Sequence, residues 1–187
     1  EKTVLKVTDY ELSFDEVLLK DVNFEIKSTD KVAIVGANGA GKTTLFQTIF
    51  NNNNSSIEIN ENIKIGYLSQ LQGQTLNYSN TIADEFFDIG FKTYDDIKEY
   101  LEGYNFDEEL LNQKIGTLSG GEKNLIQLAK ISEVGADLLL LDEPTSHLDT
   151  YSQIALEKAI KNYKGAILMV SHDYYTIANC MDYVLFI

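Results

Sequence analysis

The chain has 187 residues, of which 44% are hydrophobic, enough for one compact domain with its own core. The formal net charge is -14, from 15 basic and 29 acidic residues, which disfavours non-specific binding to nucleic acid or to an anionic membrane. All basic residues are lysines, so the chain has no arginine finger, and the single cysteine excludes an internal disulfide. No apolar run approaches the ~18 residues that a membrane helix requires.

The first third of the chain predicts strands around one helix. Residues 4–26 alternate apolar and polar side chains, the period of half-buried strands in an antiparallel layer. The apolar run 31–35 predicts a buried strand, and a helix is expected over about 42–50. Two more strands are expected at 57–59 and 63–68, after a polar linker.

The rest of the chain predicts a small helical subdomain at about 75–133, inserted in a core that alternates strands and helices. The later elements are expected as helices at about 120–133, 151–162 and 173–180 and strands at 138–141, 166–170 and 184–187. This alternation predicts an α/β fold with a mainly parallel sheet, which binds ligands at the carboxyl ends of its strands. The chain begins without methionine and ends in a strand-like run, so we expect one domain, residues 1–187, of a longer protein.

A complete phosphate-binding loop stands directly behind the strand at 31–35. Its sequence GANGAGKT fits the pattern G-x-x-x-x-G-K-[ST]. The glycines let the backbone turn tightly with its N–H groups inward, so the loop and the following helix N-terminus cradle phosphate oxygens. We expect Lys42 to reach the outer phosphates, Thr43 to ligate Mg²⁺ and Thr44 to cap an inner phosphate. The expected nucleotide-binding residues of the loop are Gly36, Ala37, Asn38, Gly39, Ala40, Gly41, Lys42 and Thr43.

Two carboxylates, Asp142 and Glu143, follow the apolar strand 138–141. At the carboxyl end of a buried strand, Asp142 can hold Mg²⁺ through its water shell, and Glu143 can orient or deprotonate a water that attacks the γ-phosphate. A solvated strand end or a helix cap explains an isolated acidic pair equally well. The phosphate loop in the same chain favours the hydrolytic interpretation.

The segment LSGGE, residues 118–122, opens a predicted helix. Ser119 and Glu122 have the spacing of a capping box, which by itself accounts for a well-capped helix. Gly120 and Gly121 are costly in a first helical turn unless another group approaches the backbone closely. A second phosphate tail at this helix N-terminus would explain them, and the residues alone leave both explanations open.

Gln70, His147 and His172 each come soon after a predicted strand. A lone glutamine is most often a surface residue, and a histidine in such a place is more often structural than functional. A histidine at the carboxyl end of a strand can also hydrogen-bond a γ-phosphate or hold the attacking water. Composition and spacing do not decide between these roles.

The chain resembles the nucleotide-binding domain of an ABC ATPase over essentially its whole length. The resemblance rests on five features in a fixed order: the phosphate loop, Gln70, LSGGE, LLLLDEP and His172. The resemblance implies an enzyme that hydrolyses ATP with Mg²⁺, with Glu143 as the catalytic glutamate and His172 as the switch histidine. It places Gln70 near Mg²⁺ and the attacking water. Further nucleotide contacts implied by the resemblance are the signature residues Ser119, Gly120 and Gly121, the D-loop Asp149, and Phe14 at the adenine-stacking position, with Tyr10 as a nearby rival.

The resemblance also implies an assembly. In ABC ATPases two domains dimerise head to tail, so that the signature serine and glycines of one domain complete the ATP site of the other. The expected partner is therefore a second ABC ATPase domain, either in the same parent chain or in a homodimer. A single copy is expected to hydrolyse ATP poorly.

Three features resemble the ABC-F subfamily: EPTSHLD with His147, the short spacing from Lys42 to Gln70, and the residues that continue LSGGE. Members of that subfamily carry two such domains on one chain and no membrane domain, and this chain looks more like the second. The likeness implies a cytoplasmic, ribosome-associated factor in translation or antibiotic resistance, with ribosome contacts outside this segment. Asn124 and Tyr174 depart from the subfamily, which usually has arginine at both positions. These departures weaken the expectation that the chain makes the subfamily's usual charged contacts to the ribosome or to the nucleotide.

Two other functions fit parts of the sequence. The ATP-hydrolysing subunit of a membrane transporter would share the ATP site, but His147 and the short spacing before Gln70 argue against it. A phosphate-loop kinase of small metabolites fits the length but not LSGGE. The chain also has no arginine with which to clamp a second phosphorylated substrate.

Overall fold

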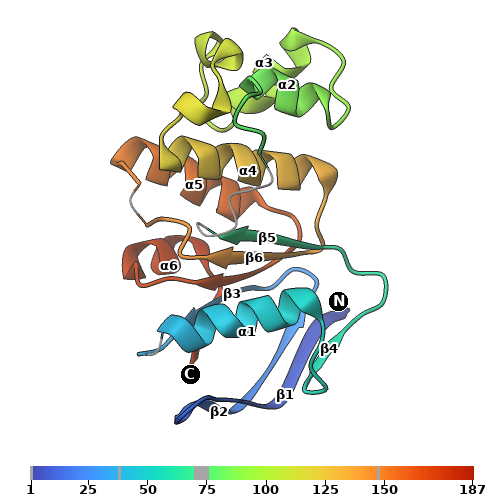
Figure 1. The fold of residues 1–187 in the computed structure, drawn as a ribbon, viewed down its shortest axis with the longest axis vertical. Helices are drawn as coiled ribbons and strands as arrows, with labels where there is room; N and C mark the ends of the chain where they lie inside the picture. The colour runs from blue at the N-terminus through green and yellow to red at the C-terminus, as the bar shows by residue number, and fades with distance from the viewer. Residues whose placement is uncertain (1, 38, 70–75, 147) are drawn as a thin grey trace. The chain divides into compact units, whose positions relative to one another are not determined.

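The computed structural model describes residues 2–37, 39–69, 76–146 and 148–187 (Figure 1). Its contacts divide the chain into two compact units. The first unit is made of Glu1–Tyr67, Ala136–Glu143 and Lys164–Ile187, and the second of Leu68–Gly135 and Pro144–Tyr163. The helical insert expected at about 75–133 falls within the second unit, which also takes in a later segment of the chain.

An antiparallel sheet forms one layer of the first unit. It contains β1 (Thr3–Ser13), β2 (Val17–Lys27) and β4 (Ile57–Ile59) in the order β2-β1-β4, and both pairings are antiparallel. The register of β1 with β2 is irregular near Asp9 and Asp21, whose φ angles are 50° and 54°. The antiparallel layer expected from the alternating pattern is confirmed.

A five-stranded sheet forms the second layer, in the order β5-β6-β7-β3-β8. The pairs β3–β7, β3–β8 and β6–β7 are parallel, as expected for an α/β fold. Every residue of β6 and β7 is buried, which confirms that both strands are covered on both faces. The five strands are β3 (Lys31–Val35), β5 (Ile65–Ser69), β6 (Leu138–Asp142), β7 (Ala166–Val170) and β8 (Tyr183–Phe186).

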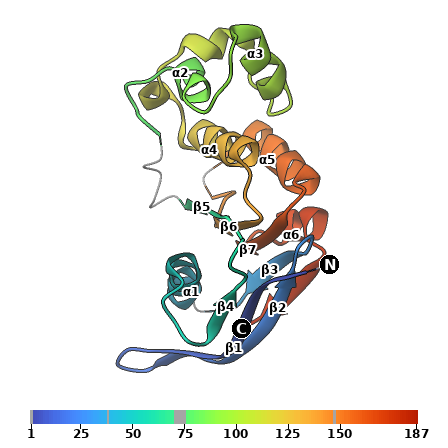
Figure 2. The same cartoon turned by 90° about the vertical axis from the view of Figure 1, so that its right-hand side faces the viewer.

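Helix α1 (Gly39–Asn51) completes the core of the first unit. Its Leu45, Phe46 and Ile49 join a hydrophobic cluster with buried residues of both sheets. Figure 2 shows the helix next to the antiparallel strands. The helix begins three residues before the expected start at about 42, so two loop glycines belong to its first turn. Helix α6 (Tyr174–Cys180) precedes the edge strand β8.

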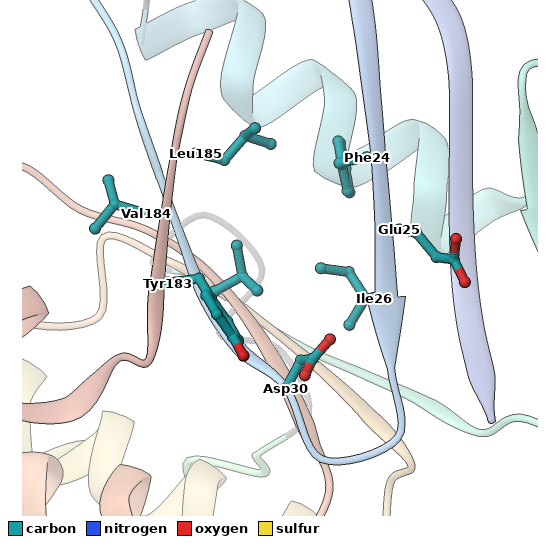
Figure 3. Close-up of a pocket in the computed structure, with 8 residues that line it drawn as sticks. Phe24, Glu25, Ile26, Asp30, Tyr183, Val184 and Leu185 are labelled. Atoms are coloured by element: carbon teal, nitrogen blue, oxygen red, sulfur yellow. The ribbon is translucent and has the colours of Figure 1, made fainter. Parts of the chain in front are cut away.

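The outer strands of the two sheets, β2 and β8, border a pocket of about 270 Å³. Figure 3 shows Ile26 of β2 and Tyr183 of β8 on opposite walls of this pocket, with Asp30 at one end. The residues that line it are Phe24, Glu25, Ile26, Asp30, Val32, Tyr183, Val184 and Leu185. None of the site residues predicted from the sequence is among them.

The second unit is helical. Side-chain caps from Thr81, Thr93, Ser119 and Asp149 begin four of its helices, which explains where each one starts. Helix α4 packs against α5, and α2 packs against α3 and η2. The elements are α2 (Ile82–Phe87), α3 (Tyr94–Glu102), the 3₁₀ helices η2 (Glu108–Asn112) and η3 (Ile115–Thr117), α4 (Gly120–Val134) and α5 (Thr150–Asn162). Among the described residues, no helix has the length and apolar character needed to cross a membrane.

Candidate nucleotide-binding and hydrolytic site

The predicted phosphate loop connects β3 to α1 in the first unit. Gly36 and Ala37 follow the strand, and the helix begins at Gly39. The first turn of α1 contains no acidic residue, so no carboxylate in that turn offsets the positive end of the helix dipole. This arrangement suits a phosphate group, as the sequence predicts.

Gly36 lies against Ile187, the residue after β8. A Cβ atom built on Gly36 would lie 2.3 Å from the backbone oxygen of Ile187, far inside normal contact. Ile187 is held in place because its N–H donates to the Val35 carbonyl at 3.0 Å. Only glycine fits at position 36 without displacing backbone.

Lys42, in the first turn of α1, is 1% exposed, and its ammonium group donates a hydrogen bond to the Gly36 carbonyl. Burial lowers the pKa of Lys42, while the nearby carboxylates of Glu143 and Asp142 act in the opposite direction. The lysine is thus folded back onto its own loop and faces the two predicted acidic site residues. A buried ammonium group that satisfies itself on the loop backbone is available to a ligand phosphate, which is a stronger acceptor.

Asp142 ends β6 and is buried. Burial raises the pKa of its carboxyl group, while hydrogen bonding from Thr43 and Tyr67 and the charge of Lys42 lower it. Of the three residues predicted at the metal, Thr43 and Asp142 are thus close enough for Thr43 to act on the Asp142 carboxyl, and Gln70 lies outside the described residues. Tyr67 was not predicted from the sequence. A tyrosine in the alternating strand 63–68 is typical of a core residue, and only the need of a buried hydroxyl for a partner would have pointed to it.

Glu143, one residue beyond β6, has a positive φ of 50°. Its N–H donates to the Val170 carbonyl at 2.8 Å, which holds the turned backbone at the end of β7. The carboxylate meets His172 twice: Oε1 lies 3.2 Å from the imidazole Nε2, and Oε2 accepts from the His172 N–H at 3.4 Å. The structure therefore joins two of the four predicted catalytic residues, Glu143 and His172, from the ends of neighbouring strands; the other two are Lys42 and Gln70.

These residues fit a nucleotide phosphate and a magnesium ion. The phosphate-facing groups are helix N–H donors and one buried ammonium, and the metal-facing groups are a carboxylate and a hydroxyl, which are oxygen ligands of the kind Mg²⁺ takes. All of these groups lie in the first unit, where parallel strands end at one edge of the sheet.

The two aromatic candidates for base stacking differ in exposure. Tyr10 is 2% exposed and belongs to the hydrophobic core, so its ring is not accessible to a ligand. Phe14 lies in the turn between β1 and β2 and is 71% exposed. In Figure 1 this turn lies at the same end of the first unit as the start of α1. Exposure therefore favours Phe14 over Tyr10.

The predicted signature segment begins α4 in the second unit. Ser119 and Glu122 form a full capping box: the Ser119 hydroxyl accepts from the Glu122 N–H at 3.1 Å, and the Glu122 carboxylate accepts from the Ser119 N–H at 2.9 Å. The two glycines differ. A Cβ atom on Gly121 would lie 2.6 Å from Leu148 Cδ2, whereas one on Gly120 would meet no atom of the described residues within 4 Å. Packing inside the unit thus explains Gly121 but not Gly120.

Asp149 has a structural role within the second unit. Its side chain accepts from the Ser152 N–H at 2.7 Å and caps α5. Asp149, Ser119 and Glu122 line a pocket of about 300 Å³, with Tyr151 and Asn105, which are joined by a hydrogen bond of 3.3 Å. The caps of two helices therefore meet in one concave region of this unit.

Three residues considered in the sequence lie outside the described part of the chain: Asn38 of the phosphate loop, Gln70 and His147. Gly39 and Ala40 are described only as part of the α1 backbone. Thr44 lies in the first turns of α1, and its carbonyl accepts from the Thr48 hydroxyl at 2.8 Å.

The fold and the phosphate loop define an α/β nucleotide triphosphatase, and a family comparison gives the class. The family model described as "ABC transporter" matches residues 19–146 of this chain. The chain therefore belongs to the ABC transporter family and is an ATPase domain that binds ATP. The expectation of an ABC-type ATPase is confirmed.

Curated relatives point to one branch of this family. "ABC transporter F family member 5" of Arabidopsis thaliana is 35% identical over an alignment of 190 positions, which covers 98% of this chain and 28% of that protein. "Protein GCN20" of Saccharomyces cerevisiae is 34% identical over 91% of this chain and 23% of its own length. "Energy-dependent translational throttle protein EttA" of Escherichia coli is 33% identical over 97% of this chain and 34% of its own length. The resemblance to ABC-F proteins is confirmed, and the chain spans about a third or less of these relatives.

Solved structures agree on the fold. The "Structure of ATP binding subunit of ABC transporter" superposes with a TM-score of 0.78 at 23% identity, covering 99% of this chain and 86% of that one. The "RNase-L Inhibitor" structure gives a TM-score of 0.76 at 23% identity, covering 99% of this chain and 37% of that one. At this level of identity the likeness shows the ABC ATPase fold.

Proposed function

We propose that this domain binds ATP with Mg²⁺ in its first unit and hydrolyses it there. The observation that carries the proposal is the gathering of Lys42, Asp142, Glu143 and His172 at the carboxyl ends of neighbouring parallel strands. Lys42 and the loop N–H groups bind the β- and γ-phosphates. Thr43 and Asp142 hold Mg²⁺, which supplies positive charge against the phosphate oxygens. Phe14 stacks on the adenine.

Hydrolysis requires a base for the attacking water, and Glu143 supplies it. The water oxygen forms a bond to the γ-phosphorus while the bond to the β-phosphate oxygen breaks, and a water proton passes to the Glu143 carboxylate. His172 contacts both carboxylate oxygens of Glu143 and fixes the carboxylate's orientation. The histidine side chain is exposed enough to hydrogen-bond a γ-phosphate as well. Gln70 assists at the metal and the water, as the family resemblance implies.

The second unit serves a second ATP site. Ser119, Gly120 and Gly121 open a well-capped helix, and Gly120 has open space where a side chain would stand. Since no described residue of this unit occupies that space, we assign it to the phosphates of an ATP bound to a second ABC domain. Two domains then meet head to tail, with Asp149 at the interface, and each completes the other's site.

A substitution at the proposed base tests this assignment. Glu143→Gln keeps the side-chain shape but removes the base, so ATP binding should persist while hydrolysis falls at least a hundredfold. Sedimentation with saturating Mg-ATP should then show a stable dimer. Glu58→Gln, an exposed position on β4, makes the same charge change and should leave hydrolysis unchanged. A Glu143→Gln variant that stays monomeric contradicts the composite site.

We further propose that the parent protein is a cytoplasmic ABC-F factor that acts on the ribosome, in translation or in antibiotic resistance. The support is the similarity to GCN20 and to the translational throttle protein EttA. The chain most resembles the second of two tandem domains. In the full-length protein, Glu143→Gln with ATP should cosediment with ribosomes, and the same protein with ADP should not. Equal behaviour with both nucleotides contradicts a ribosomal role.

The alternative is the ATP-hydrolysing subunit of a membrane transporter, which the family model's description favours. Such a subunit would have its ATPase rate controlled by a membrane partner. Copurification of the parent protein with an integral membrane protein, in place of ribosomes, would support this alternative.

A further inference from the structure

His172 lies in a short turn between β7 and α6, and the residue on each side of it is anchored. Ser171 follows β7 directly and is 1% exposed. Its hydroxyl accepts a hydrogen bond from the Asp173 N–H at 3.0 Å. A serine that bonds the N–H two residues later closes a turn. His172 is therefore carried at the tip of a closed turn.

Asp173 ties the same turn to the start of α6. Its Oδ1 accepts hydrogen bonds from the N–H groups of Tyr175 and Thr176, both at 3.1 Å, so Asp173 is the N-cap of the helix. Thr176 and Ile177 are buried, at 0% and 5% exposure, which anchors the helix in the first unit. The turn is thus closed by Ser171 and fastened to a packed helix by Asp173.

The contact between His172 and Glu143 depends on this turn. The His172 side chain is 60% exposed, so packing of the core does little to fix the imidazole. Its Nε2 nevertheless lies 3.2 Å from Glu143 Oε1, and its backbone N–H donates to Oε2 at 3.4 Å. The backbone that presents the histidine therefore sets where both of its polar groups lie.

We propose that Ser171 and Asp173 are positioning residues that hold His172 against Glu143. The inference rests on the proposed roles of Glu143 and His172 in hydrolysis, and it adds two residues for which the sequence predicted no role. A turn held by two side-chain acceptors keeps the imidazole near the carboxylate before water attacks, so that less ordering is left for the transition state. ATP binding uses the phosphate loop and does not depend on the turn.

Asp173→Ala tests this role by removing the acceptor at the start of α6. We measure steady-state ATP hydrolysis by the purified chain over a range of ATP concentrations. Asp173→Ala should lower kcat about tenfold with little change in KM, because the contact that it loosens acts after ATP has bound. Asp173→Asn should restore kcat to within about twofold, since asparagine caps a helix as well as aspartate does. Unchanged kcat in Asp173→Ala, or no recovery in Asp173→Asn, overturns the proposal.

Two further variants separate positioning from a loss of folding. Ser171→Ala removes only a hydroxyl from a small buried residue and should also lower kcat at unchanged KM. Thr93→Ala is the matched control: it removes the cap of α3, where the Thr93 hydroxyl accepts from the Asp96 N–H at 3.1 Å. Thr93 is not among the predicted site residues, so kcat should stay the same. An equal loss of kcat in Thr93→Ala would show that loss of any helix cap is enough.

A double substitution tests whether Asp173 acts through the histidine. In the His172→Ala background the imidazole is already gone, so adding Asp173→Ala should slow hydrolysis by less than about threefold more. A further loss as large as in the unsubstituted background would mean that Asp173 acts independently of His172, and the positioning role would be wrong.

The same variants distinguish this inference from the proposed function. If His172→Ala alone leaves kcat unchanged, the role assigned to His172 in hydrolysis is itself wrong. If His172→Ala lowers kcat while Ser171→Ala and Asp173→Ala do not, the proposed function stands and only the positioning role is refuted.

Discussion

Lys42 and Asp142 are buried charges whose pKa values move in opposite directions, and both move toward the neutral form because burial disfavours charge. Neither group is arranged mainly for the stability of the first unit. If a phosphate and Mg²⁺ bind as proposed, Lys42 gains an anion beside it and Asp142 gains a cation. Ligand binding would then offset the cost of keeping both charges buried, and perturbed pKa values of this kind are common at functional sites.

Tyr100 gives a residue-scale prediction in the second unit. Two causes raise the pKa of Tyr100 above the ordinary value of 10.0: burial, which has the larger effect, and a hydrogen bond with Tyr104. The Tyr100 hydroxyl also donates to the Ala129 carbonyl at 2.7 Å. Above about pH 10 the folded protein therefore holds a proton that the unfolded chain has lost. The stabilisation from this tyrosine is complete below about pH 10 and is lost as the pH rises further.

Urea unfolding of Tyr100→Phe and of the unsubstituted chain at about pH 8 and about pH 10.5 tests this point. At the lower pH the variant should be less stable by about 1 kcal/mol, the usual cost of one hydrogen bond. The difference should shrink at the higher pH. Tyr78→Phe, at an exposed position, should show no such pH-dependent difference. A Tyr100→Phe deficit that grows with pH would contradict the prediction.

At the scale of elements, the start of α4 shows which residues of LSGGE have a structural role and which are left for a ligand. The capping box of Ser119 and Glu122 fixes where the helix begins. Gly121 is required by the close approach of Leu148, whereas no described residue of the unit requires glycine at position 120. The local explanation and the ligand explanation therefore apply to different glycines of the same motif.

The two glycine substitutions should behave differently. Gly120→Ala should leave stability unchanged or raise it by up to about 1 kcal/mol, because alanine is the better helix former, yet should slow ATP hydrolysis more than tenfold. Gly121→Ala should lower stability by about 1–3 kcal/mol through overpacking. Chemical denaturation and steady-state ATPase rates measure both effects. Full activity in Gly120→Ala would remove the argument for a partner's phosphate at this position.

At the scale of the whole molecule, charge sets the conditions for assembly. Each copy carries a formal net charge of -14, so two copies repel each other when they approach. ABC domains dimerise, and bound ATP must overcome this repulsion. Salt should therefore assist dimerisation, in contrast to an interface held together by exposed ion pairs, which salt weakens.

The Glu143→Gln variant with saturating Mg-ATP provides the measurement. Raising NaCl from about 0.1 M to about 1 M shortens the screening length from ~10 Å to ~3 Å, and the dimer fraction in sedimentation should rise. The same variant with ADP should remain monomeric at both concentrations. A dimer that dissociates as salt is raised would show that attraction between opposite charges, and not ATP-mediated contact, dominates the interface.

Local patterns were enough to predict most elements of this chain. The apolar runs 31–35 and 166–170 coincide with β3 and β7, and the helix after Ser119 begins where its capping box predicts. The start of α1 was predicted three residues late, since the glycines of the loop indicate a turn although they join the helix. Periodicity and capping are properties of neighbouring residues, so sequence alone reveals them.

By itself, the sequence determined the phosphate loop, the order of the motifs and hence the ABC ATPase family, because those patterns depend on residues close together in the chain. Only the tertiary structure decided which residues meet: Gly36 lies against Ile187, and His172 lies against Glu143. It also decided that Phe14 is exposed and Tyr10 buried. The physical reason is that burial and long-range contact are set by the packing of sheets and helices, which no local spacing encodes.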